Sequence, residues 1–195
     1  MAQEADVENY VAKTLERFGR IDGFFNNAGI EGRQNLTEAF TAAEFDRVVS
    51  INLRGAFLGL EKVLKVMHEQ GSGMVVNTAS VGGIRGIGNQ SGYAASQHGL
   101  VGLTRNSGIE YRPLRHPHQR HRPRRDLDAD GRGLDEAAER RRPARRRRAV
   151  HPGNPTKRYG EAPEIASVVA FLLSDDASYV NATVVPIDGG QSAAY

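Results

Sequence analysis

Apolar residues recur along the chain in two patterns that alternate with each other. In residues 6–21, 41–68, 93–110 and 163–173 they return every three or four positions, which is the spacing of one helix face. In residues 23–27, 74–77 and 183–187 they form short, nearly uninterrupted runs, which are typical of buried strands. The alternation of strands with helices predicts an α/β fold with a parallel sheet and helices on both faces.

Helix signals accompany these segments. The sequence Thr41-Ala42-Ala43-Glu44 has the spacing of a capping box, and Pro163 stands in the first turn of a later helix. Gly19 follows the first helical segment. The long helix predicted over residues 41–68 carries its apolar positions on one stripe, namely Phe45, Val48, Val49, Leu53, Phe57, Leu60 and Val63.

Composition excludes several classes of protein. The chain has 195 residues, enough for one domain with a real core, and contains no cysteine. Disulfides, iron–sulfur clusters, thiolate zinc sites and cysteine nucleophiles are therefore excluded. No apolar run is long enough to cross a membrane, and Met1-Ala2-Gln3-Glu4 lacks the features of a secretory signal. We expect a cytoplasmic protein with no membrane partner.

The net charge of +3 is unevenly distributed. Residues 111–148 contain 14 Arg against 6 Asp and Glu, a local balance of +8, so the rest of the chain carries −5. The pI of 9.4 therefore describes this Arg-rich block rather than the whole chain. The block contains no aromatic residue after Tyr111, which disfavours a platform for stacking nucleic-acid bases.

Two hydroxyl side chains could act together on a carbonyl group. Ser80 ends a predicted strand, and Tyr93 opens a predicted helix thirteen residues later. Both are expected on the carboxyl side of the sheet, where open α/β proteins bind ligands. There a serine can donate a hydrogen bond to a carbonyl oxygen and a tyrosine can transfer a proton. Taken alone, Ser80 could equally be a turn residue and Tyr93 a packing residue.

Two further segments are candidates for binding. The small residues of Asn26-Asn27-Ala28-Gly29 follow a strand and would let a flat ligand approach the backbone, although an ordinary turn explains the sequence as well. Asn52 lies inside a predicted helix, where asparagine is a mediocre helix former. It would hold a water or a kink, or else lie on a solvated face.

Taken together, these residues resemble the short-chain dehydrogenase/reductase family. The resemblance is carried by Asn-Asn-Ala-Gly at 26–29, by Asn52, Ser80 and Tyr93, and by Asp188-Gly189-Gly190, and it covers residues 5–112 and 154–195. It implies a Rossmann-type, doubly wound parallel sheet and an NAD-dependent oxidoreductase, with NADP as the alternative cofactor. The implied reaction interconverts a carbonyl and a secondary alcohol on a small molecule, with a cyclic ketone or diketone as one candidate. The implied assembly is a homotetramer or homodimer.

The resemblance also implies individual roles. Tyr93 would be the general acid/base, Ser80 would orient the carbonyl, and Asn52 would hold a proton-relay water. The residues expected to line the adenosine side of the cofactor are Asn26, Ala28 and Gly29.

The chain departs from the family pattern at two places that bear on activity. The family begins with a β-α-β-α-β part that binds the pyrophosphate and selects the cofactor, and this chain resembles the family only from the following helix onward. We therefore expect an N-terminally truncated domain. The family lysine four residues after the tyrosine is replaced by Gln97, which supplies no charge. We expect the chain as written to be impaired in catalysis.

The Arg-rich block has a reading in a shifted frame. Residues 116–131 read HPHQRHRPRRDLDADG, and one nucleotide string that encodes them gives IRINAIAPGAIWTPM when read one base along. The second sequence is a well-formed family strand followed by a Pro-Gly loop. We interpret residues 1–195 as one partial domain in which residues 114–153 are out of frame and disordered.

A second function stays open at this point. A non-catalytic pseudo-reductase or interaction protein, with a basic segment that binds nucleic acid, would also account for Gln97 and the Arg-rich block. The complete set of Asn52, Ser80 and Tyr93 favours the enzyme.

Overall fold

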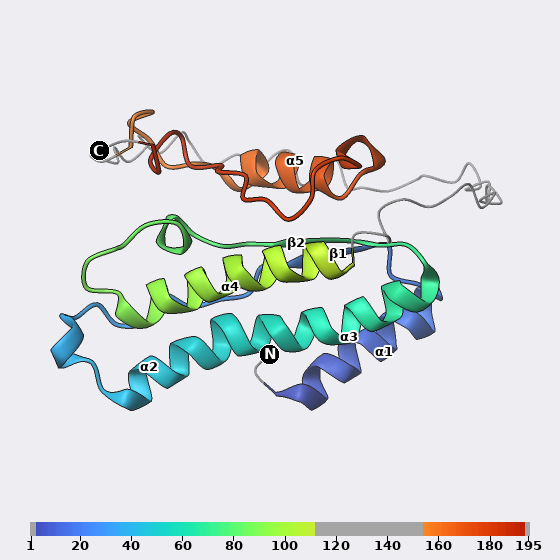
Figure 1. Ribbon diagram of the computed structural model, residues 1–195, viewed down its shortest axis with the longest axis horizontal. Coiled ribbons are helices and arrows are strands. Elements are labelled where there is room, and N and C mark those ends of the chain that lie inside the picture. The colour runs from blue at the N-terminus through green and yellow to red at the C-terminus, as the bar shows by residue number, and fades with distance from the viewer. Residues whose placement is uncertain (1–2, 112–153, 194–195) are drawn as a thin grey trace, which may run out of the picture.

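The computed structural model describes residues 3–111 and 154–193 (Figure 1). The Arg-rich block after Tyr111 and the predicted out-of-frame and disordered segment 114–153 lie outside the described residues. The helices are α1 (Glu4–Phe18), α2 (Ala42–Val49), α3 (Gly55–Gln70), α4 (Ser91–Glu110) and α5 (Ala162–Leu172). The strands are β1 (Gly23–Asn26) and β2 (Met74–Asn77). Short helical turns are η1 (Thr37–Ala39), η2 (Ser50–Arg54), η3 (Val81–Gly83) and η5 (Asp175–Ala177).

The two strands form a parallel pair between layers of helix. Gly23 lies opposite Met74 and Asn26 opposite Asn77, so both strands end at the same edge. Helices α1, α3 and α4 lie on one side of the strands and α5 on the other (Figure 1). In the part of the chain that the structure describes, the predicted parallel pairing and the helices on both faces are confirmed.

The helix signals of the sequence are confirmed at several ends. Thr41 Oγ1 accepts a hydrogen bond from the Glu44 amide, and the Glu44 carboxylate accepts one from the Thr41 amide, which completes the capping box. Gly19 ends α1 in the left-handed conformation with φ of 72°. The helix predicted over residues 41–68 is interrupted by η2, a π-helical turn that contains Asn52.

The hydrophobic core lies between α1, α3 and the strands. Its buried centre consists of Val11, Ile21, Val63 and Met67. Phe24 of β1 and Val75 of β2 pack against this centre. The core therefore fixes both strands against the helix layer and sets where their carboxyl ends lie.

Three predictions about apolar segments were wrong. Residues 183–187 form no strand, although their sequence is β-branched and apolar. The strands predicted to be buried are only partly so, and Phe25 is 41% exposed. On the predicted stripe of residues 41–68, Phe45 and Phe57 are exposed. The missing strand and the partial exposure of β1 and β2 have the same cause. Among the described residues β1 and β2 pair only with each other, so the apolar runs lack the neighbours that would cover them.

None of the helices in residues 3–111 and 154–193 combines the length and the apolar character needed to cross a membrane.

Candidate active site

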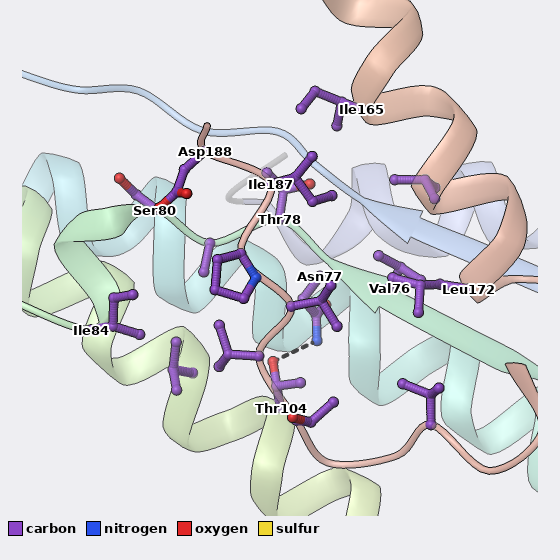
Figure 2. A pocket seen from close by; sticks show the side chains of 18 of the residues that line it. Val76, Asn77, Thr78, Ser80, Ile84, Thr104, Ile165, Leu172, Ile187 and Asp188 are labelled. Carbon is purple, nitrogen blue, oxygen red and sulfur yellow. Dashed lines mark hydrogen bonds between the residues drawn. The ribbon is translucent and has the colours of Figure 1, made fainter. Parts of the chain in front are cut away.

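Ser80 lies just beyond the end of β2 and holds the next turn in place. Its Oγ accepts a hydrogen bond from the Gly82 amide at 3.2 Å, which makes Ser80 the N-cap of η3. The side chain is half-buried and lines a cavity of about 300 Å³ (Figure 2). Because Oγ accepts this bond, its O–H stays available to donate to a ligand.

Tyr93 lies in the first turn of α4 and packs against the same turn. A Cβ added at Gly82 would lie 3.6 Å from Cδ1 of Tyr93 and 2.9 Å from Cδ1 of Ile87. Gly82 therefore contacts both hydroxyl-bearing residues. Its amide donates to Ser80, and its Cα faces the ring of Tyr93. A larger residue at position 82 would require the end of the Ile87 side chain to move. Ser80 lines the cavity, whereas Tyr93 is not among its lining residues. That the two hydroxyls act together stays a prediction.

Asn52 is 2% exposed and uses its carboxamide inside the protein. Oδ1 accepts from the Ile30 amide at 2.8 Å, and Nδ2 donates to the Ile30 carbonyl at 2.8 Å and to Ser96 Oγ at 3.1 Å. Asn52 therefore fixes the chain just after Asn26-Asn27-Ala28-Gly29 and ties it to α4. Of the alternatives left by the sequence, the solvated face is wrong, because Asn52 is buried. Asn52 lies in the π-helical turn η2, which separates α2 from α3.

The small residues that follow β1 leave the backbone open to a ligand and also make room for Asn52. Asn27, Ala28 and Gly29 are exposed, so their backbone is open to a ligand. A Cβ added at Gly29 would lie 3.2 Å from Asn52 Oδ1, closer than most Cβ atoms approach another atom. Asn26 points the other way, since its Nδ2 donates to the Ala56 carbonyl and to Asn77 Oδ1, each at 3.0 Å.

Asn77 was missed by sequence reasoning. Its Oδ1 accepts a hydrogen bond from Asn26 Nδ2, and its Nδ2 donates one to Thr104 Oγ1, each at 3.0 Å. Asn77 therefore connects the ends of both strands to α4 (Figure 2). A signal for it exists in the sequence, because both apolar runs end in asparagine. In a parallel pair in register, two such residues are neighbours.

Gln97 is buried, with 5% of its surface exposed. Its Oε1 has no hydrogen-bond partner among the described residues. An unsatisfied buried acceptor costs free energy, so such an atom usually meets a donor from a ligand or a water. Gln97 lies one helical turn after Tyr93 on α4. At this position α4 packs closely against η3, because a Cβ added at Gly83 would lie 2.8 Å from the Gln97 carbonyl oxygen.

The closing turn at Asp188-Gly189-Gly190 is anchored by Asn154, which sequence reasoning also missed. Asn154 is 7% exposed, and its Nδ2 donates to the Asp188 carbonyl at 2.7 Å. Hydrogen bonds from Ser192, and then from the Gly190 amide, hold the pKa of Asp188 below its usual value. The Asp188 carboxylate therefore stays ionised and fixes this turn at the edge of the cavity that Ser80 lines.

Two features of the described residues fit a nicotinamide dinucleotide. No group of three or more His, Cys, Asp or Glu side chains able to hold a metal ion occurs within residues 3–111 and 154–193. The unsatisfied Oε1 of Gln97 could accept a ribose hydroxyl, and the exposed small residues Ala28 and Gly29 leave room for a ring system.

The sequence matches known proteins over its whole length. Residues 1–115 match the family model described as short chain dehydrogenase, and residues 134–192 match one described as enoyl-(acyl carrier protein) reductase. The chain is 68% identical to levodione reductase of Leifsonia aquatica over 202 residues, which cover 100% of this chain and 73% of that protein. It is 33% identical to cyclohexanol dehydrogenase of Acinetobacter sp. (strain SE19), covering 98% of this chain and 72% of that protein.

Solved structures give the same picture. The crystal structure of levodione reductase superposes with a TM-score of 0.78 at 64% identity, covering 100% of this chain and 75% of that chain. The structure of NAD+-bound xylitol dehydrogenase superposes with a TM-score of 0.75 at 29% identity, covering 97% of this chain and 76% of that chain.

Proposed function

Because this chain belongs to the short-chain dehydrogenase/reductase family, we propose that Ser80 and Tyr93 interconvert a carbonyl and a secondary alcohol in it. The chain is an oxidoreductase with a Rossmann-type fold, and its cofactor is a nicotinamide dinucleotide. Among the two dinucleotides we favour NAD, which the xylitol dehydrogenase neighbour holds.

The proposal rests on the hydrogen bond between Ser80 and Gly82. The Gly82 amide occupies one lone pair of Ser80 Oγ, so the hydroxyl proton can point to a carbonyl oxygen of the substrate. Tyr93 packs on the other side of the same glycine. These two contacts at Gly82 support the proposal that a hydrogen-bond donor and a proton donor serve the same oxygen.

The steps of reduction follow from these positions. When bound, the nicotinamide supplies the hydride that adds to the carbonyl carbon. Ser80 donates a hydrogen bond to the carbonyl oxygen and stabilises the negative charge that grows on it. Tyr93 gives its phenolic proton to that oxygen and completes the alcohol. In oxidation, ionised Tyr93 takes the proton back, and the hydride that leaves the carbon would pass to the oxidised dinucleotide.

Three further groups support this centre. Asn52 positions the loop after β1 through the backbone of Ile30, and it would steady a relay water beside α4. Asn26, Ala28 and Gly29 would line the adenosine side of the cofactor, with Asn26 acting from beneath through its bonds to Ala56 and Asn77. Gln97 would accept a hydroxyl of the nicotinamide ribose, but it supplies no charge to favour ionised Tyr93.

For the substrate we propose a cyclic ketone or diketone and its alcohol. The names of two relatives support this class, levodione reductase and cyclohexanol dehydrogenase. We further propose a homodimer or homotetramer, as membership of the family implies. The cytoplasmic location stays a prediction.

The test is a steady-state assay of NADH oxidation with a cyclic diketone. Tyr93→Phe should lower turnover by roughly 10²–10⁴-fold, and Ser80→Ala should lower it strongly as well. Tyr179→Phe is the matched control, because Tyr179 is 96% exposed. Turnover that survives Tyr93→Phe would refute the assignment.

The alternative is a pseudo-reductase that binds ligands without turning them over. Gln97 in place of a lysine is the observation that favours it. Calorimetric titration with NADH, run beside the assay, separates the two functions: binding without turnover in both the parent chain and Gln97→Lys identifies the pseudo-reductase. Turnover in either of them identifies the enzyme.

A further inference from the structure

Ser96 lies on α4, one turn after Tyr93, and its exposed fraction is 0%. Its hydroxyl makes two hydrogen bonds. Oγ accepts one from Asn52 Nδ2 at 3.1 Å and donates one to the Tyr93 carbonyl oxygen at 2.7 Å. A serine hydroxyl has a single proton, so the second bond fixes where that proton points. Ser96 therefore connects Asn52 with the backbone of the proposed proton donor.

The same hydrogen bonds continue back to the loop that follows β1. The Ile30 amide donates to Asn52 Oδ1 at 2.8 Å, Asn52 Nδ2 donates to Ser96, and Ser96 donates to the carbonyl of Tyr93. Each donor points toward Tyr93, and hydrogen bonds aligned in this way strengthen one another. The carboxamide of Asn52 has one possible orientation, because the Ile30 amide needs an acceptor and the Ile30 carbonyl needs a donor.

The loop at the start of this series is the one proposed to receive the cofactor. Gly29 immediately precedes Ile30, and a Cβ added at Gly29 would lie 3.2 Å from Asn52 Oδ1 and 3.6 Å from its Cγ. Asn52 is 2% exposed, and Ser96 is fully enclosed. In a close-packed interior neither side chain can take up a shift of the loop by moving into solvent. A displacement at Gly29 is therefore passed to Asn52 and from there to Ser96.

A second serine of α4 shows which part of this arrangement is ordinary. Ser107 is 9% exposed, and its Oγ donates to the Leu103 carbonyl at 2.9 Å. Such bonds to the preceding turn are common for serines inside helices. In the described contacts Ser107 Oγ bonds only to carbonyls of its own helix, whereas Ser96 also accepts from another element. The bond from Asn52 is thus the part that helix geometry alone does not explain.

We propose that Ser96 is a positioning residue that transmits the position of the loop 27–30 to Tyr93. The inference rests on the proposed role of Tyr93 as proton donor. The bond at the Tyr93 carbonyl fixes the backbone from which the phenol extends. A misplacement of about 1 Å in a reacting group can cost about 10²-fold in rate, so this link would matter for proton transfer more than for substrate binding.

The first experiment tests the transmission without ligand or turnover. A fluorinated tyrosine is incorporated at position 93 of the full chain, and its resonance is followed by fluorine NMR. Gly29→Ala pushes on Asn52 and should displace this resonance by more than its linewidth. The same substitution should leave the resonance in place when it is combined with Ser96→Ala. Ser107→Ala is the matched control, and in its presence the displacement should persist.

The second experiment separates positioning from a loss of stability. Ser96→Ala should lower kcat at least about tenfold and leave the KM for a cyclic ketone within about twofold of the parent value. Ser107→Ala should leave both constants unchanged. If Ser96→Ala fails to fold, Ser96→Cys takes its place in both experiments, because a thiol keeps the volume of the side chain but is a weak donor and acceptor.

Three results of the first experiment would overturn the proposal. They are a resonance that Gly29→Ala does not move in the parent chain, a displacement that survives Ser96→Ala, and a displacement that Ser107→Ala abolishes as well. An unchanged kcat in Ser96→Ala would also overturn it. A parent chain without turnover would instead refute the proposed function, and the fluorine resonance would still decide the role of Ser96.

Discussion

The side chain of Asn52 binds both backbone groups of Ile30. Its Oδ1 accepts from the Ile30 amide and its Nδ2 donates to the Ile30 carbonyl, each at 2.8 Å. The two residues are 22 positions apart in sequence, and the contact joins the π-helical turn of one helix to the loop that leaves β1. The loop that would receive the cofactor is thereby fixed from below.

Loss of this contact should destabilise the fold. Asn52→Ala leaves an amide and a carbonyl of Ile30 without partners, which costs about 1–3 kcal/mol of unfolding free energy. Urea denaturation followed by circular dichroism measures it. Asn106→Ala is the control, because the Asn106 side chain bonds only the exposed Glu110 in the described contacts. Equal stabilities of the two variants would show that the Ile30 contact contributes nothing.

Gln97→Lys should change how catalysis depends on pH. A cation at position 97 favours the ionised form of a nearby phenol, so the pH–rate profile should reach its plateau at lower pH than in the parent chain. Gln34→Lys adds the same charge at an exposed position and should leave the profile in place. Superimposable profiles for the parent chain and Gln97→Lys would contradict the role of Tyr93 as proton donor.

Gly189 is required both by its backbone conformation and by its neighbours. Its φ is +63°, and an added Cβ would lie 2.7 Å from Asn154 Oδ1 and from Thr156 Oγ1. Gly189→Ala should therefore lower the unfolding free energy by more than about 1 kcal/mol, seen as a lower Tm. Gly160→Ala, at a position with open space and no positive φ, should be close to neutral. A Tm for Gly189→Ala as high as that of Gly160→Ala would argue against the closing turn being fixed as described.

The ion pairs of Lys62 predict a loss of stability in acid. Its Nζ lies 2.8 Å from Glu4 Oε1 and 3.0 Å from Glu8 Oε1. The hydrogen bond from Lys62 is the main cause that lowers the pKa of Glu4 below its ordinary value of 4.5. A depressed carboxyl pKa stabilises the fold above the unfolded value, and that contribution is lost as pH falls through the folded value.

Lys62→Met should therefore flatten the acid limb of stability against pH, measured by urea denaturation from about pH 7 to about pH 3. Lys13→Met, which removes an exposed charge on α1, is the control. The same acid limb in both variants would mean that the Glu4 pair does not contribute. Added salt should weaken the effect, because these groups are at the surface.

The sequence predicted best those features that depend on residues close together in the chain. The capping box at Thr41 and the stop at Gly19 depend on residues within one turn, and both are confirmed. The segment 183–187 shows the opposite case. Its composition favours a strand, but a strand exists only when another backbone pairs with it, and the described residues offer none.

In the candidate site, too, some features could be predicted from the sequence and others could not. Ser80 and Tyr93 could be placed at one edge of the sheet, because parallel strands end together. That Gly82 would join them could not be predicted, since the course of a glycine-rich loop has no period. The partner of Asn52 was hidden for the same reason: Ile30 lies in a stretch with neither helical nor strand pattern.

The π-helical turn Ser50–Arg54 also determines the angular phase between α2 and α3. A π turn holds one residue more than an α turn, so the side-chain faces on its two sides are offset by about 100°. Val48 before it and Leu58 after it are both buried under this offset. Removing one residue from the turn would rotate α2 as a unit and carry Val48 out of the core. We therefore expect this turn to tolerate substitutions better than insertions or deletions, because its number of residues sets the orientation of α2 relative to α3.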